Sequence, residues 1–146
     1  MPLFSRIPVD KQQLERAIAQ LEQQSSAELR IYIERKTPPK MTALERAFEQ
    51  FQQLEMDKTQ ARNGVLIYLA FKQHQCAIIG DQGIHQYVND AFWQAQIDLM
   101  ISHFKQGNYT QGILAAMERI GVELAQHFPI QPDDVNELDN EVIIND

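Results

Sequence analysis

Cysteine is nearly absent from this chain, which has one, Cys76, among 146 residues. A single cysteine excludes an internal disulfide framework and is typical of proteins in a reducing compartment. Cys76 lies in an apolar stretch, where a buried and unreactive thiol is the simplest interpretation. A chain of this length can bury a hydrophobic core without disulfides or a structural metal, so one ordinary domain is expected.

Long apolar runs are also missing. No stretch approaches the roughly 20 apolar residues of a membrane-spanning helix. Residues 1–6 lack the extended apolar region of a signal peptide. We therefore expect a soluble, cytoplasmic protein without a membrane span.

An excess of positive charge is absent too, because 13 Lys and Arg residues stand against 20 Asp and Glu residues. No basic patch indicates nucleic acid as a partner. The acidic excess is concentrated in residues 129–146, which hold six Asp and Glu and no Lys or Arg. We divide the chain into one domain over residues 1–130 and an acidic tail over residues 131–146.

The tail also carries apolar residues, among them Val142, Ile143 and Ile144. Acidic extensions are usually solvated, but apolar side chains need a surface to cover them. Two alternatives stay open for this segment. It docks on the body of the domain, or it binds a protein partner through residues 130–146.

Apolar residues recur at helical or strand spacing along most of the chain. Helices are predicted at residues 10–24, 42–54 and 110–127. Between residues 83 and 106, a short helix followed by a longer one is predicted. Asp10, Thr42 with Glu45, and Asn89 or Asp90 have the residue types of N-caps. The helix after Thr42 is expected to turn its apolar side chains inward, namely Leu44, Ala47, Phe48, Phe51 and Leu54.

Three strands are predicted, within residues 29–33, 62–70 and 77–85. The first alternates apolar and polar residues, which indicates one buried face. The second and third are separated by the short break 72–75 and form an antiparallel hairpin. A helix connects the first two strands, so these run parallel. The order α-β-α-β-β-α-α predicts an α/β fold, an αβα sandwich with a small mixed sheet and helices on both faces.

These strand directions bring polar residues from separate segments to one end of the sheet. Glu28 begins the first strand, Arg62 and Asn63 begin the second, and Asp81 and His85 follow the third. We expect their side chains to converge around three glycines, Gly64, Gly80 and Gly83.

Two carboxylates, Glu28 and Asp81, together with the Asn63 amide suit a hard cation such as Ca²⁺ or Mg²⁺. A carboxylate with Arg62 and His85 could instead hold an anionic group such as phosphate. A structural interpretation competes with both, because Asp81 could cap the next helix and Asn63 could only form a turn. No established nucleophile, P-loop or metalloprotease motif is present.

The residues around the hairpin resemble the TPM domain family. The matching stretches are Ser26–Leu29, Leu54–Ile67, Ile79–His85, Phe92-Trp93, Phe104–Ile113, His127–Pro129 and Asp134–Leu138. The resemblance covers nearly the whole chain and points to a short, soluble bacterial branch. It implies an αβα sandwich and a link to membrane-protein upkeep, with acid phosphatase activity and divalent-cation binding attributed to some members.

Two departures from the family pattern limit which functional residues of the family can be assigned to this chain. The chain lacks the family's signal peptide and membrane anchor, and Gly80-Asp81-Gln82-Gly83 stands where many relatives have a Gly-Tyr-Gly-Leu turn. Of the motif residues, Arg62-Asn63-Gly64 and Gly80 carry over.

We therefore expect a binding module with Glu28 and Asp81 as metal ligands and with Asn63, Gly64, Gly80 and Gly83 lining the site. The alternative is a metal-assisted phosphomonoester hydrolase, in which His85 is the acid or base and Arg62 holds the phosphate. A third alternative is an interaction domain that acts through its tail.

Overall fold

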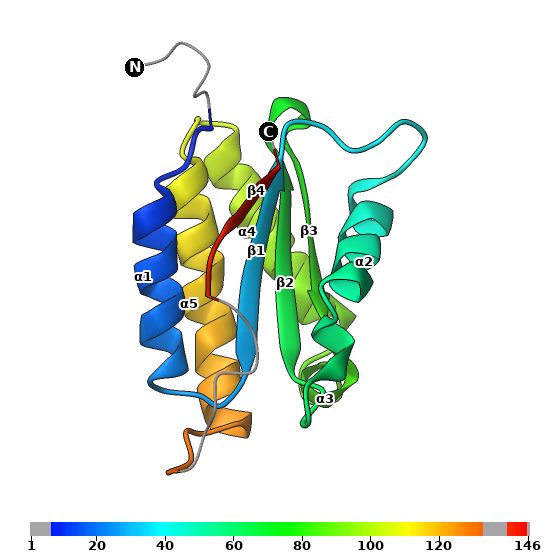
Figure 1. Cartoon of the computed structure of the whole chain (residues 1–146). Coiled ribbons are helices and arrows are strands. Elements are labelled where there is room, and N and C mark those ends of the chain that lie inside the picture. The colour runs from blue at the N-terminus through cyan, green and yellow to red at the C-terminus, as the bar shows by residue number, and fades with distance from the viewer. Residues whose placement is uncertain (1–6, 133–139, 146) are drawn as a thin grey trace.

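A computed structural model describes residues 7–132 and 140–145 of the chain. A four-stranded sheet lies between two helical layers (Figure 1). The helices are α1 (Lys11–Glu22), α2 (Ala43–Gln53), α3 (Gln82–His85), α4 (Asp90–Phe104) and α5 (Tyr109–His127). The strands are β1 (Glu28–Glu34), β2 (Gly64–Ala70), β3 (Gln75–Gly80) and β4 (Ile143–Asn145). Single 3-10 turns, η1 (Met56–Lys58) and η2 (Phe71–Gln73), lie in two connections.

The strand order is β3-β2-β1-β4. β1 runs parallel to both β2 and β4, whereas β3 runs antiparallel to β2. The predicted mixed sheet, hairpin and parallel crossover are thus confirmed. The sequence analysis missed β4, which is three residues long and lies in the acidic tail. The described end of the tail docks on the body, while residues 133–139 lie outside the described part.

Helices cover both faces of the sheet. Figure 1 shows α2 on one face and α1, α4 and α5 on the other. The larger core contains Leu14, Ile31, Ile67 and Phe104, and the core under α2 contains Tyr32, Ala47, Phe51, Leu66 and Tyr68. All seven residues of β1 are therefore buried. The prediction of a single buried face for this strand was wrong, because α2 covers its polar side as well.

Of the five residues predicted to face inward from α2, three do so, Ala47, Phe51 and Leu54, and two do not. Leu44 and Phe48 are 57% and 51% exposed, whereas Ala43, Ala47, Gln50 and Phe51 face the sheet. The buried residues form a stripe at spacings of four, seven and eight, and Leu44 and Phe48 lie on the neighbouring stripe, about 100° around the helix. Small side chains at Ala43 and Ala47 let the helix approach the strands closely.

The residues predicted as N-caps do cap their helices in the structure. The Asp10 side chain accepts a hydrogen bond from the Gln13 amide, Thr42 and Glu45 form a complete capping box, and Asn89 caps α4. Gly107, with φ +80°, follows the end of α4 in the left-handed conformation that glycine favours.

Cys76 is buried on β3, and burial raises the pKa of its thiol to about 12. Thiolate is therefore scarce at neutral pH, in line with the predicted inert role. Across residues 7–132 and 140–145, no helix combines the length and the apolar character needed to cross a membrane.

Candidate functional site

The amino rim of the sheet, where β1 and β2 begin and β3 ends, gathers the predicted site residues. Glu28 lies opposite Gly64 in the parallel β1–β2 pair, and Val65 lies opposite Gly80 in the antiparallel β2–β3 pair. The Asp81 amide donates to the Gly64 carbonyl at 2.9 Å. Glu28 and Asp81 therefore lie at the same rim, as the strand directions predicted.

Arg62 and Asp81 form a two-pronged ion pair at this rim. Arg62 Nε and an Nη nitrogen donate to the two Asp81 carboxylate oxygens at 2.7 and 2.9 Å. Asp81 is buried, while 41% of the Arg62 side chain is exposed. Hydrogen bonding to Asp81 raises the pKa of Arg62, and the charge of Asp57 raises it further. Asp57 thus lies close enough to the guanidinium to act on it.

Asp81 also takes the structural role that the sequence allowed. One carboxylate oxygen accepts from the Gln82 amide at 2.8 Å and so caps the short helix α3. Asp81 therefore joins three segments: the loop before β2, the end of β3 and the start of α3.

Gly83 explains why the two loops of the rim can touch. Its amide donates to the Arg62 carbonyl at 2.7 Å. A Cβ atom at this position would lie 2.2 Å from the Ala61 carbonyl oxygen and 2.5 Å from that of Arg62. No side chain fits there, so the glycine permits backbone-to-backbone packing.

His85 turns toward α4. Its Nδ1 accepts a hydrogen bond from Trp93 Nε1 at 3.0 Å, and its Nε2 lies 3.6 Å from the exposed carboxylate of Asp90. Gly80 adjoins the same indole, since a Cβ on Gly80 would lie 2.2 Å from Trp93 Cζ2. The structure gives Arg62 and His85 different partners, Asp81 and Trp93.

Three buried oxygen atoms in the segment before β2 lack a hydrogen-bond partner: Asp57 Oδ1, Thr59 Oγ1 and Asn63 Oδ1. Thr59 and Asn63 are 4% and 2% exposed. Asn63 was predicted to belong to the site, whereas Asp57 and Thr59 were not among the predicted site residues. The sequence signal for them is three oxygen-bearing side chains within seven residues, immediately before Gly64.

Among the described residues, no three His, Cys, Asp or Glu side chains are grouped closely enough to hold a metal ion. The partnerless oxygens before β2 are instead mixed: one belongs to a carboxylate, one to a hydroxyl and one to an amide. Hard cations accept such mixed oxygen sets.

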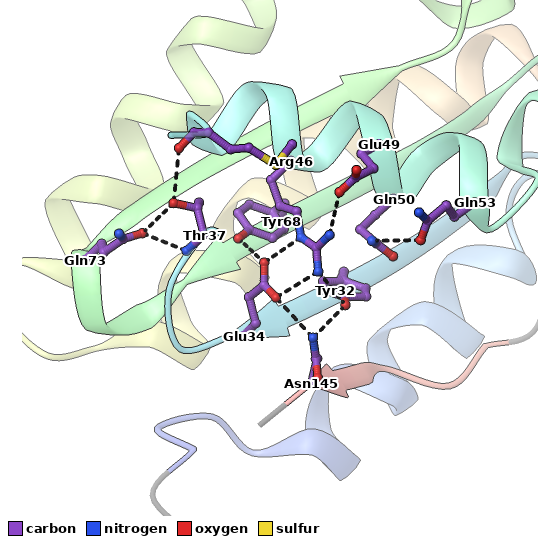
Figure 2. A network of polar contacts seen from close by, with 11 residues as sticks. Tyr32, Glu34, Thr37, Arg46, Glu49, Gln50, Gln53, Tyr68, Gln73 and Asn145 are labelled. Atoms are coloured by element: carbon purple, nitrogen blue, oxygen red, sulfur yellow. Dashed lines mark hydrogen bonds and ion pairs between the residues drawn. The ribbon is translucent and has the colours of Figure 1, made fainter. Parts of the chain in front are cut away.

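A second polar cluster, which the sequence analysis did not anticipate, lies at the opposite end of β1. Figure 2 shows the buried Glu34 carboxylate between Arg46, Tyr68 and Asn145. Arg46 Nε donates to Glu34 at 2.8 Å, and Arg46 also contacts Glu49. Asn145 reaches the cluster from β4 and donates to Tyr32 Oη at 3.1 Å. The tail strand is thus fixed by side chains as well as by backbone pairing.

Comparisons with known proteins agree with this architecture. A family model described as the TPM domain matches residues 7–123. The chain is similar to BA42 from the psychrophilic bacterium Bizionia argentinensis, with 35% identity, a TM-score of 0.85 and coverage of 97% of this chain and 98% of that one. No curated protein matches the chain significantly.

Two further solved structures share the fold at low identity. The N-terminal domain of a protein from P. gingivalis has 17% identity and a TM-score of 0.64, with 77% of this chain and 72% of that one covered. The N-terminal domain of the cg2496 protein from Corynebacterium glutamicum has 15% identity and a TM-score of 0.61, with coverage of 85% and 84%.

Proposed function

This chain belongs to the TPM domain family, and we propose that it is a binding module for a divalent cation, Ca²⁺ or Mg²⁺, at its amino rim. The observation that carries the proposal is the set of partnerless oxygens on Asp57, Thr59 and Asn63. Each such buried acceptor costs on the order of 1–3 kcal/mol when it is left unpaired. A hard cation prefers oxygen ligands and would remove that cost.

The charges at the rim also favour a cation. Asp57 and Asp81 both act on the single guanidinium of Arg62. Lys58 Nζ also lies 4.0 Å from Asp57 Oδ2, but its side chain is 70% exposed, so this pair offsets the charge of Asp57 only weakly. The Arg62 side chain is 41% exposed, so its head group can move into solvent while its stem stays in place. Asp81 would then become available as a ligand beside Asp57.

The donor set implies weak binding. Affinity for Ca²⁺ rises with the number of carboxylate ligands and with the rigidity of the site. Here most donors are neutral, and Asp81 is engaged by Arg62. We expect a dissociation constant of roughly 10⁻⁴–10⁻³ M, the range of Ca²⁺ sites with few charges. Glu28 begins β1 at the same rim, but among the described residues no three acidic side chains are grouped closely enough for one metal ion, so Glu28 is not counted as a ligand beside Asp57 and Asp81.

Calorimetric titration of the full chain with CaCl₂ and MgCl₂ tests the proposal. Asp57→Asn is expected to weaken binding at least tenfold, because it removes the charged donor. Asp98→Asn, an equal charge change on the exposed side of α4, is the matched control and should leave affinity unchanged. Equal binding by both variants, or no binding up to 10 mM cation, would contradict the proposal.

Phosphomonoester hydrolysis is the weaker alternative. It needs Arg62 to hold phosphate and His85 to transfer a proton, but Asp81 and Trp93 occupy these side chains. Hydrolysis of a chromogenic phosphate ester that disappears in Asp81→Ala would favour this alternative. Equal activity in the wild type and the variant would indicate a contaminant.

A further inference from the structure

A cavity of about 610 Å³ opens at the carboxyl rim, where β1, β2 and β4 end. It is lined by Glu34, Arg35, Lys36, Lys72 and Asn145. Three of these five side chains are cationic, in a chain whose formal net charge is −7. We propose that this cavity binds a small oxyanion, a phosphate or carboxylate group, with Lys36 and Lys72 supplying most of the attraction. The proposal is independent of the cation site.

The topology of the sheet favours a ligand at this place. In open α/β sheets, ligands bind outside the carboxyl ends of the strands, at the point where the strand order reverses. Here the chain leaves β1 toward β2 and β3 and later returns to β4 on the other side of β1. The crossover α2 covers one face, and α4 and α5 cover the other (Figure 1). The carboxyl ends of β1 and β4 form that reversal point, and both border the cavity.

The two loops that carry the cations are held together by hydrogen bonds. The Lys72 amide donates to the Arg35 carbonyl at 2.9 Å. The Thr37 amide donates to the Gln73 side chain at 3.0 Å, as Figure 2 shows. The positions of Lys36 and Lys72 over one cavity are therefore set before any ligand arrives, which lowers the entropy cost of binding.

The carboxylate in the lining is already engaged. One Glu34 oxygen accepts from Arg46 Nε at 2.8 Å and from the Tyr68 hydroxyl, and the other accepts from Arg46 and Asn145. Glu34 is 4% exposed. Arg46 offsets part of the Glu34 charge and is shared with Glu49, so the attraction of an anion depends on the three cationic side chains of the lining.

The two rims can be tested separately. β1 has seven residues, so the rims lie about 20 Å apart at ~3.3 Å per residue. Titration of the ¹⁵N-labelled full chain with sodium phosphate at constant ionic strength should shift the Lys36 and Lys72 amide signals in a saturable way. Asn63 and Gly83 signals report the cation site instead. Sodium succinate serves as the carboxylate probe.

The double variant Lys36→Gln/Lys72→Gln should weaken binding at least tenfold. Both side chains are exposed, so the fold should be retained, which the amide spectrum verifies. Lys58→Gln/Arg119→Gln removes the same charge from other exposed positions and should bind as the wild type does. A response to either probe that the first pair alone removes supports the site. The proposal is overturned if no amide signals shift at 20 mM of either probe, or if both double variants lose binding equally.

Discussion

Arg62 and Asp81 lie 19 residues apart in sequence and form two parallel hydrogen bonds, at 2.7 and 2.9 Å. The pair ties the loop before β2 to the loop after β3. The Arg62 guanidinium also places a positive charge at the amino rim, beside the Asp81 carboxylate. A cation that binds there must compete with Arg62 for the Asp81 carboxylate.

This competition predicts the effect of Arg62→Gln on cation affinity. Removing the guanidinium frees Asp81 and deletes a repulsive charge a few ångströms from the site. Ca²⁺ should bind roughly tenfold more tightly, as expected for one unit charge at such a distance near a protein surface. Isothermal titration calorimetry measures the change. Arg119→Gln, on the exposed side of α5, is the control, and unchanged or weaker affinity in Arg62→Gln would contradict the competition.

Gly83→Ala should destabilise the fold by about 1–3 kcal/mol, the usual cost of forcing an atom into a packed site. The added methyl would meet the carbonyl oxygens of Ala61 and Arg62, which belong to the backbone and cannot rotate away. Gly121→Ala is a useful contrast, because its Cβ would lie 3.4 Å from Leu21 and would favour the helix. Urea unfolding of both variants tests this, and equal midpoints would refute the close packing of the rim loops.

The environment of Tyr68 leads to a prediction of how the free energy of unfolding depends on pH. Burial and the hydrogen bond to Glu34 raise the pKa of Tyr68 above its ordinary value of 10.0. The folded state therefore keeps the proton after the unfolded state loses it. This contribution to stability is complete below about pH 10 and decreases as pH rises further, by up to ~1.4 kcal/mol per pH unit.

Tyr68→Phe isolates this effect. At pH 7 the variant should lose about 1.5–3 kcal/mol, the range for a hydrogen bond to a charged group. Above pH 10 the difference from the wild type should shrink, since phenylalanine does not ionise. Unfolding free energies measured by urea titration at pH 7, 10 and 11 provide the test. A difference that stays constant over this range would show that Tyr68 titrates equally in both states.

Because Leu44 and Phe48 are exposed on α2, replacing them should change the stability of the fold little. Leu44→Gln and Phe48→Gln should each change the unfolding free energy by about 0.5 kcal/mol or less, as is usual at the surface. Phe51→Ala, at a buried position of the same helix, should cost about 3–5 kcal/mol. Thermal unfolding tests the exposed position of Phe48, because a Phe48 that faced inward, as predicted, would be as costly to replace as Phe51.

Much of the fold followed from local patterns. The capping residues Asp10, Thr42 and Asn89 mark helix starts because their side chains satisfy backbone amides that the helix leaves free. The strand directions followed from connection lengths, and they correctly placed Glu28 and Asp81 at one rim.

The features that could not be predicted from the sequence depend on contacts between distant segments. β4 is short, lies in an acidic tail and pairs with a strand more than 100 residues earlier, so no local signal marks it. Glu34 looked like a solvated strand residue because its partner Arg46 is on a helix whose rotation the pattern did not fix. Asp57 and Thr59 are distinguished by side-chain oxygens that are buried without partners, and that burial depends on tertiary packing.

The central claim is that a divalent cation binds at the amino rim and not merely along the acidic tail. Substoichiometric Mn²⁺ tests it directly, since the bound ion broadens nearby amide signals of the ¹⁵N-labelled chain. We predict selective broadening of Asn63, Gly64 and Gly83, reversed by excess Mg²⁺ or Ca²⁺. Broadening confined to residues 133–141, with the rim signals unchanged, would contradict the account.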